Sequence, residues 1–503
     1  MAGKKKLSMK ESYRAMVRGL DWQPTYQPEE KIFPYHHFEG IKIHDWDQWE
    51  DPFRMTVETY WKYQAEKDRR FYAILDGFVQ SQGHLNLSDA RYLSALKLFI
   101  QGVTPLEYMA HRAFSFTARF LPGSAPRFAA LAQSMDELRH AQTEIHAISP
   151  YNRYYSGMHS MRRWHDRVWY LSVPKSFFDD AVASGPFEFL TAISFGFEYL
   201  ITNLLFVPFM SGASFNGDLT TMTFGFSAQS DESRHMTLGL ESVKFMLEQD
   251  EDNVPIVQEW IDKWFWRSYR VAALVAAMMD YMLPRRFMSW KEAFELYFEE
   301  QMMEGLFPDL KYYGIKPPRH VEQAIKEKEY LSHQVYWVLY SFTYAAMFHT
   351  WVPDSEEMSW LSAKYPSTFD RNFRPLLEKA REMQKQGQRF VFPALPQLCQ
   401  VCQIPMAFTI PGQPIQHAQH CSTYHGEIYW TCSEGCQWIF EREPEKYVQA
   451  WLPVHEIYKG NCGGATVPEV LAWYGDQGDS GDYQDSADRR HWIAWHNQVN
   501  ELV

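Results

Sequence analysis

A five-residue motif that occurs twice restricts the possible folds of this chain more than any other feature. It reads DELRH at residues 136–140 and DESRH at residues 231–235. In each copy a Glu and a His are three residues apart, which places both on one face of a helix. Each copy also follows another Glu, Glu107 or Glu198, at the distance along the chain that two antiparallel helices and a turn require.

The resulting pattern, Glu followed by Glu-x-x-His and written twice, is the ligand set of a ferritin-like dimetal carboxylate bundle. Four carboxylates offset most of the charge of two close cations and favour hard, high-valent iron, while two imidazoles leave open positions for O₂. A metal also accounts for Glu198, which lies in the apolar stretch 194–215, where an unpaired charge would be very costly. The predicted ligands are Glu107, Glu137, His140, Glu198, Glu232 and His235.

The residues beside each Glu and His are repeated as well. Asp136 and Asp231 are expected to accept the second N–H of a metal-bound imidazole and so to fix its tautomer. Arg139 and Arg234 are expected to pair with those aspartates. The alternative is a set of surface salt bridges, but the duplication of Asp-Glu-x-Arg-His favours a supporting role around the metals.

Helical periodicity dominates the first 390 residues, and strand-like alternation is scarce there. Long helices are expected to begin at Ser88 or Asp89 and to continue, with turns, to about residue 385. Although residues 194–215 are apolar enough to be considered as a membrane span, Glu198 and Pro208 favour a core helix. The expected units are an irregular N-terminal arm with short helices (1–85), a helical metal-binding domain (86–390), a small α+β module (391–460) and a C-terminal tail (461–503).

The cysteines mark the boundary of the small module, since all six lie between Cys399 and Cys462. Their paired spacing predicts a structural zinc site in a reduced compartment. Three of its ligands are expected to be Cys399, Cys402 and Cys432, and the fourth is either His420 or Cys436. Cys421 and Cys462 are then left over. The sequence around YHGEIYWTC resembles a YHS-type zinc ribbon.

Charge and composition exclude several functions. The net charge of −13 argues against a nucleic-acid or anionic-membrane binder. No nucleotide-binding fingerprint is present, and the N-terminus has no apolar segment typical of a secretory signal. The 17% aromatic content fits a deep core together with subunit interfaces.

The two motifs, together with TPLEY, FEYLITN, WQPTYQPEEKIFP, SFFDD and MDYMLP, resemble the α (large) subunit of bacterial multicomponent diiron monooxygenases. The similarity covers roughly residues 10–460 and is greatest to phenol hydroxylase. It implies a mainly α fold, a ferritin-like four-helix diiron bundle extended by further helices, with a small C-terminal YHS-like module. It also implies that the six residues above bind two irons.

The resemblance also implies roles for further residues near the metal site. Thr202 matches a threonine that assists O₂ activation, and Asn203 and Gln229 match polar residues near the iron on a proton route. It further implies an apolar substrate pocket lined by Val103, Ala110, Phe177, Phe197 and Phe206.

The implied reaction is hydroxylation of phenol or methylphenols to catechols with O₂. Electrons would come from NADH through a separate reductase that carries FAD and a [2Fe-2S] cluster. Expected partners are β and γ subunits in a cytoplasmic α₂β₂γ₂ complex and a small effector protein, with no nucleic acid and no membrane. Alternatives are a toluene, benzene or alkene monooxygenase subunit, a ribonucleotide reductase radical subunit, an acyl desaturase, and a non-enzymatic ferritin-like iron-binding protein.

Overall fold

The computed structural model describes residues 7–18, 25–28, 40–87, 90–151, 169–283, 285–332, 399–404 and 420–449, with scattered shorter pieces elsewhere. The predicted N-caps Ser88 and Asp89, the boundary near residue 390, Cys462 and the tail 461–503 lie outside the described residues.

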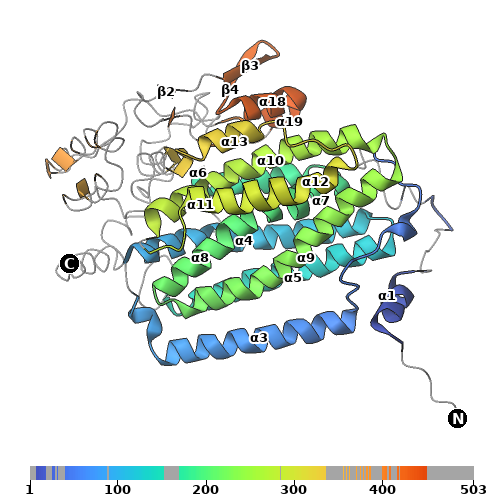
Figure 1. Cartoon of the computed structure of the whole chain (residues 1–503), viewed down its shortest axis with the longest axis horizontal. Helices are drawn as coiled ribbons and strands as arrows, with labels where there is room; N and C mark the ends of the chain where they lie inside the picture. Colours follow the sequence, from blue (N-terminus) through green and yellow to red (C-terminus); the bar gives the residue numbers. More distant parts are fainter. Residues whose placement is uncertain are drawn as a thin grey trace.

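The predicted mainly helical fold is confirmed (Figure 1). The longer helical elements are α1 (Met9–Val17), α3 (Val57–Gln80), α4 (Ala90–Phe120), α5 (Ser124–Ile148), α6 (Trp169–Val182), α8 (Asn203–Phe215), α9 (Leu219–Gln249) and α10 (Asn253–Ala277). Shorter helical elements are η2 (Trp46–Gln48), η3 (Gly83–Leu85), α7 (Pro186–Leu190), η6 (Met278–Met282), α11 (Trp290–Phe294), α12 (Phe307–Lys311) and α13 (Val321–Glu327). Three of the described elements are π-helices: η5 (Thr191–Thr202), η7 (Glu295–Leu306) and the short η6.

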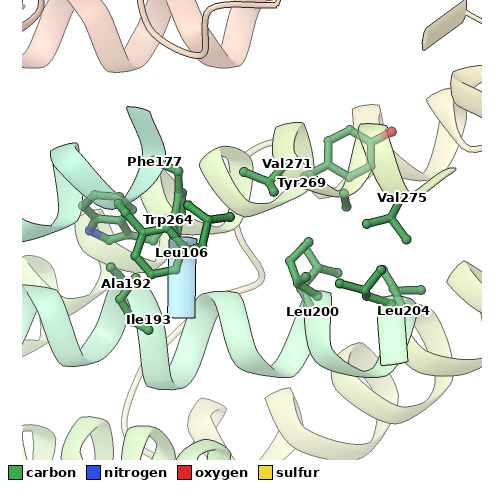
Figure 2. Packing of buried hydrophobic residues seen from close by; sticks show 14 of the residues in the cluster. Leu106, Phe177, Ala192, Ile193, Leu200, Leu204, Trp264, Tyr269, Val271 and Val275 are labelled. Atoms are coloured by element: carbon green, nitrogen blue, oxygen red, sulfur yellow. The ribbon is translucent and has the colours of Figure 1, made fainter. Parts of the chain in front are cut away.

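The apolar stretch that was considered as a membrane span is the centre of the core. Elements α7, η5 and α8 form one continuous helix, Pro186–Phe215, which is long and apolar enough to cross a membrane by length and composition. Within the fold, however, 72% of its most apolar window is buried. Leu200 and Leu204 of this helix face Val271 and Val275 of α10 (Figure 2).

Helix α9 approaches the backbone of η5 very closely. A Cβ atom added at Gly239 would lie 2.2 Å from the carbonyl carbon of Ser194. A side chain at this position would push the two elements apart. Gly239 therefore allows the second Glu-x-x-His helix to pack directly against the helix that carries Glu198.

The prediction that residues 1–85 contain only short helical pieces is wrong for α3, a 24-residue helix. This helix packs on α9, and its buried apolar residues lie mainly in its C-terminal half. In its N-terminal half the inward side chains include Gln64 and Lys67, which bind buried aspartates and not apolar groups. That polar inward face weakened the apolar period from which a long helix would have been recognised.

The small C-terminal module lies across α10, on the side of the bundle opposite α3 (Figure 1). It contains the antiparallel hairpin of β3 (His420–Tyr424) and β4 (Glu427–Thr431), then α18 (Glu434–Arg442) and α19 (Pro444–Gln449). A separate short antiparallel pair joins β1 (Ala407–Phe408) and β2 (Gln416–His417). Because a Cβ at Gly435 would lie 2.4 Å from the Trp266 ring, glycine lets α18 begin directly against α10.

Candidate metal centre

The six predicted ligands come together from four elements. Helix α4 supplies Glu107, η5 supplies Glu198, and α5 and α9 each supply one Glu-x-x-His pair. Each of the six side chains belongs to a residue that is less than one-tenth exposed. Burial of four carboxylates at one place requires a compensating positive charge.

The distances divide the six predicted ligands into two Glu–His pairs and two glutamates that lie between the pairs. His140 Nδ1 lies 3.5 Å from Glu107, and His235 Nδ1 lies 3.8 Å from Glu198. Glu232 lies between both rings, 3.2 Å from His140 Nδ1 and 2.8 Å from His235 Nδ1. Glu137 also faces both rings, at 3.8 and 3.5 Å. This is an arrangement for two cations, each with one terminal Glu and one His, and two carboxylates between them.

The electrostatics of the cluster fit bound cations. Burial, and then the charges of the neighbouring carboxylates, raise the pKa of Glu137 and Glu198 well above the usual range. Nδ1 of His140 is buried and receives no hydrogen bond from the described residues. Oxygen and imidazole donors of this kind suit iron, and two cations would relieve the repulsion among the carboxylates.

Glu198 owes its position to a π-helix. The i→i+5 hydrogen bonds of η5 widen the helix relative to an α-helix, and such segments frequently occur at functional sites. One turn further on, Thr202 Oγ1 donates a hydrogen bond to Glu198 Oε2 at 2.7 Å. Thr202 is therefore in direct contact with a predicted ligand.

Each of the two motif aspartates lies against the histidine of the other motif copy. His140 Nε2 is 3.2 Å from Asp231, and His235 Nε2 is 3.2 Å from Asp136. Since Nδ1 of each ring faces the carboxylate cluster, Nε2 remains for the aspartate. An aspartate bonded there holds the ring so that Nδ1 is available to a metal.

The motif arginines follow the same crossed pattern. Arg234 forms an ion pair with Asp136, and Arg139 Nη1 lies 3.3 Å from Asp231. Burial opposes ionisation of Asp231. The hydrogen bond with His140 and the positive charges around it outweigh that effect and hold the pKa of Asp231 below its usual range.

Asn203 and Gln229 contact each other, and no contact of either with a predicted ligand is seen among the described residues. Gln229 Nε2 donates to Asn203 Oδ1 at 3.3 Å, between α8 and α9. The sequence interpretation missed Gln133, which donates to Glu137 Oε1 at 3.0 Å and accepts a hydrogen bond from Ser194. Its position one turn before Glu137 on α5 was the available signal.

A cavity of about 120 Å³ lies directly beside the carboxylate cluster. Four of the predicted pocket residues line it: Val103, Ala110, Phe197 and Phe206. Its polar wall is formed by Thr202 and four glutamates of the cluster, and the rest of its lining is apolar.

Phe177, the fifth predicted pocket residue, is not among the residues that line this cavity. Phe177 is fully buried behind Phe197, with the two ring centroids 5.0 Å apart, and its neighbour Phe178 lines the cavity instead. Consecutive residues on an α-helix point about 100° apart, so a shift of one position moves a side chain off the cavity wall. Figure 2 shows Phe177 packed beside Trp264.

The cysteine cluster contains Cys436 and not His420. The sulfur atoms of the four buried cysteines lie within 4.8 Å of one another: Cys399, Cys402, Cys432 and Cys436. Burial, and then hydrogen bonds among the thiols, raise the pKa of Cys436 well above its usual range. Cys421, on β3, is exposed and lies outside the cluster.

Comparison with known proteins agrees with this geometry. A family model for methane, phenol and alkene hydroxylases matches residues 22–250, and a YHS-domain model matches residues 411–451. The chain is 56% identical over 499 residues to phenol 2-monooxygenase, oxygenase component DmpN, of Pseudomonas sp. (strain CF600), covering 99% of this chain and 96% of that protein. The chain belongs to the methane, phenol and alkene hydroxylase family.

Other members of the hydroxylase family support this conclusion. The alkene monooxygenase oxygenase component subunit alpha of Xanthobacter autotrophicus (strain ATCC BAA-1158 / Py2) is 28% identical over 474 residues, 92% of each chain. The crystal structure of xenon-pressurized phenol hydroxylase from Pseudomonas sp. OX1 matches with a TM-score of 0.87 and 56% identity. It covers 97% of this chain and 100% of that one.

The predicted family resemblance is thus confirmed, and the chain is a monooxygenase subunit of the diiron type. Its relatives are oxygenase components, that is, parts of systems with several components. Family membership does not support the alternative interpretations as a ribonucleotide reductase subunit, an acyl desaturase or an iron-storage protein.

Proposed function

We propose that this chain is the large subunit of a phenol hydroxylase, and that it converts phenol or methylphenols to catechols with O₂. The observation that carries the proposal is the apolar cavity of about 120 Å³ whose one polar wall is the carboxylate cluster. An apolar cavity of about 150 Å³ binds benzene in another protein, so this space suits a single aromatic ring. The 56% identity to a phenol 2-monooxygenase component favours phenol over an alkene.

In this proposal Glu107 and His140 would hold one iron and Glu198 and His235 the other, and Glu137 and Glu232, which face both rings, would serve both irons. The bound irons would supply the activation of O₂. The chain contributes the apolar wall that excludes water and holds the ring beside the cluster. Thr202 holds a proton at Glu198 Oε2 through its hydrogen bond.

The electrons are proposed to come from NADH through a separate FAD- and [2Fe-2S]-containing reductase. The proposed partners are β and γ subunits in a cytoplasmic α₂β₂γ₂ complex and a small effector protein. That the chain works with other components is supported by the relatives' names as oxygenase components and by large exposed hydrophobic side chains suited to subunit interfaces. Examples are Trp61, Tyr108, Phe116 and Phe226. The composition itself follows from the family resemblance.

We also propose that Cys399, Cys402, Cys432 and Cys436 bind a structural zinc ion. Cys432 Sγ lies 3.4 Å from Cys402 Sγ and 3.5 Å from Cys436 Sγ. Tetrahedral zinc, with Zn–S bonds of about 2.3 Å, holds its sulfurs about 3.8 Å apart, so small adjustments suffice.

The function is tested by single turnover of the reduced, iron-loaded complex with phenol and ¹⁸O₂. Catechol with one ¹⁸O atom is the expected product, with toluene and propene as competing substrates. If the complex with all its partners and two irons per chain hydroxylates toluene or propene but not phenol, the proposal of a phenol hydroxylase is wrong.

The cavity predicts a change in substrate preference. Ala110→Val adds two methyl groups to the wall, and we expect it to lower kcat/KM for methylphenols about 10-fold relative to phenol. Ala113→Val is the control, since Ala113 is equally buried on α4 but is not in the cavity wall. An unchanged ratio of methylphenol to phenol turnover in Ala110→Val would contradict the placement of the ring at this wall.

A further inference from the structure

Gln64 of α3 connects the two motif aspartates. Its side chain is almost completely buried, and its Nε2 atom donates to Asp136 Oδ1 at 2.6 Å and to Asp231 Oδ1 at 2.8 Å. Its Oε1 atom has no hydrogen-bond partner among the described residues. The two carboxylates, which can only accept when ionised, therefore determine how the amide is turned.

The crossed pattern gives this contact its importance. Asp136 supports the ring of His235, and Asp231 supports the ring of His140. Gln64 therefore contacts the support of both imidazoles, although α3 carries none of the six predicted ligands.

The neighbours of Gln64 on the same face of α3 each contact one aspartate. Tyr60 donates from its hydroxyl to Asp136 Oδ1 at 2.8 Å, and Lys67 Nζ lies 2.6 Å from Asp231 Oδ2. These residues stand four before and three after Gln64, so all three form one stripe along the helix. On this stripe, Tyr60 and Lys67 each contact one aspartate, and Gln64, which lies between them, contacts both.

We propose that Gln64 is a positioning residue that holds the two halves of the metal centre in register. The arginines supply the positive charge that the aspartates need, whereas the neutral amide fixes the distance between the two carboxylates. Through them it fixes the directions of both imidazole rings. This inference rests on the proposed diiron function.

The test replaces Gln64 by methionine, which has a similar size and no N–H donor, in the complete hydroxylase loaded with ⁵⁷Fe. Mössbauer spectra are expected to change for both irons, and a chelator is expected to remove both irons about 10-fold faster than from the wild type. Tyr60→Phe is expected to change only the iron bound by His235, and Lys67→Met only the iron bound by His140.

Leu75→Ala is the matched control, because Leu75 is a buried residue of α3 that lies in the hydrophobic core. Gln64→Asn is a second variant, which retains the N–H donor on a shorter side chain. It is expected to change the Mössbauer spectra and chelation rates of both irons, but by less than Gln64→Met does. The inference is overturned if Gln64→Met and Gln64→Asn leave both irons as in the wild type or alter only one. It is also overturned if Leu75→Ala reproduces the two-sided change. A wild-type complex that binds no iron would instead refute the diiron function itself.

Discussion

Replacement of Glu232 by alanine is expected to reduce catechol formation by on the order of 10⁴-fold, a loss typical of removing a residue that acts as part of a unit. The carboxylate of Glu232 lies between the two imidazoles, 3.2 Å from His140 Nδ1 and 2.8 Å from His235 Nδ1. Without it, both proposed irons lose a shared ligand. Iron analysis of the purified variant should therefore show fewer than two irons per chain.

Glu241→Ala provides the control for this experiment. Glu241 lies on the same helix as Glu232, is partly exposed and is 3.6 Å from Lys244. It should retain full iron content and activity, because exposed ion pairs contribute little to stability. Two tightly bound irons and near-normal turnover in Glu232→Ala would contradict the proposed sharing of this carboxylate.

Cys402→Ala is expected to remove the zinc and to destabilise the protein by more than about 3 kcal/mol, since structural zinc contributes directly to folding. The loss extends beyond the module. Arg267 Nη1 donates to the carbonyl of Val401. Burial opposes ionisation of Arg270, but negative charge at Cys432 and at Glu327 outweighs that effect and raises its pKa. Without the metal-bound thiolates, part of the charge that balances these buried arginines is lost.

Zinc content, thermal unfolding and turnover should be measured together for this variant. Loss of zinc is expected to lower turnover as well, because α10 carries the buried arginines on one face and cavity-lining Val271 and Val275 on another. Cys421→Ala is a suitable control, since Cys421 is exposed and outside the cluster. If Cys402→Ala unfolds like the wild type and keeps its activity, the proposed structural role of the metal is wrong.

Local sequence signals located much of the metal-binding bundle. Helix α9, for example, begins directly after the turn-forming residues Asn216-Gly217-Asp218, because the side chain of Asp218 caps its first turn. The duplicated Glu-x-x-His motif brought the six candidate ligands to one place, since its spacing defines a helix face. These features depend only on residues close together in sequence.

The features that were missed depend on how helices are placed relative to one another. The crossing of Asp136 and Asp231 follows from the way α5 faces α9, which no single helix encodes. The exchange of Phe177 for Phe178 reflects a rotation of one residue on α6. The contribution of Gln64 was not predicted because polar contacts hid the length of α3.

Helix α10 separates two sites and is restricted by both. Its side chains at Val271, Leu274 and Val275 form cavity wall, and Trp266 and Arg267 hold the cysteine module. A substitution on the cavity face of α10 that improves the fit of a new aromatic substrate can therefore disturb the packing of the cysteine module on its other face. Helix α4, which lines the cavity with Val103 and Ala110, packs mainly on α5 and not on the described part of the module. Adaptation of this enzyme to new substrates should accordingly proceed through α4 more readily than through α10.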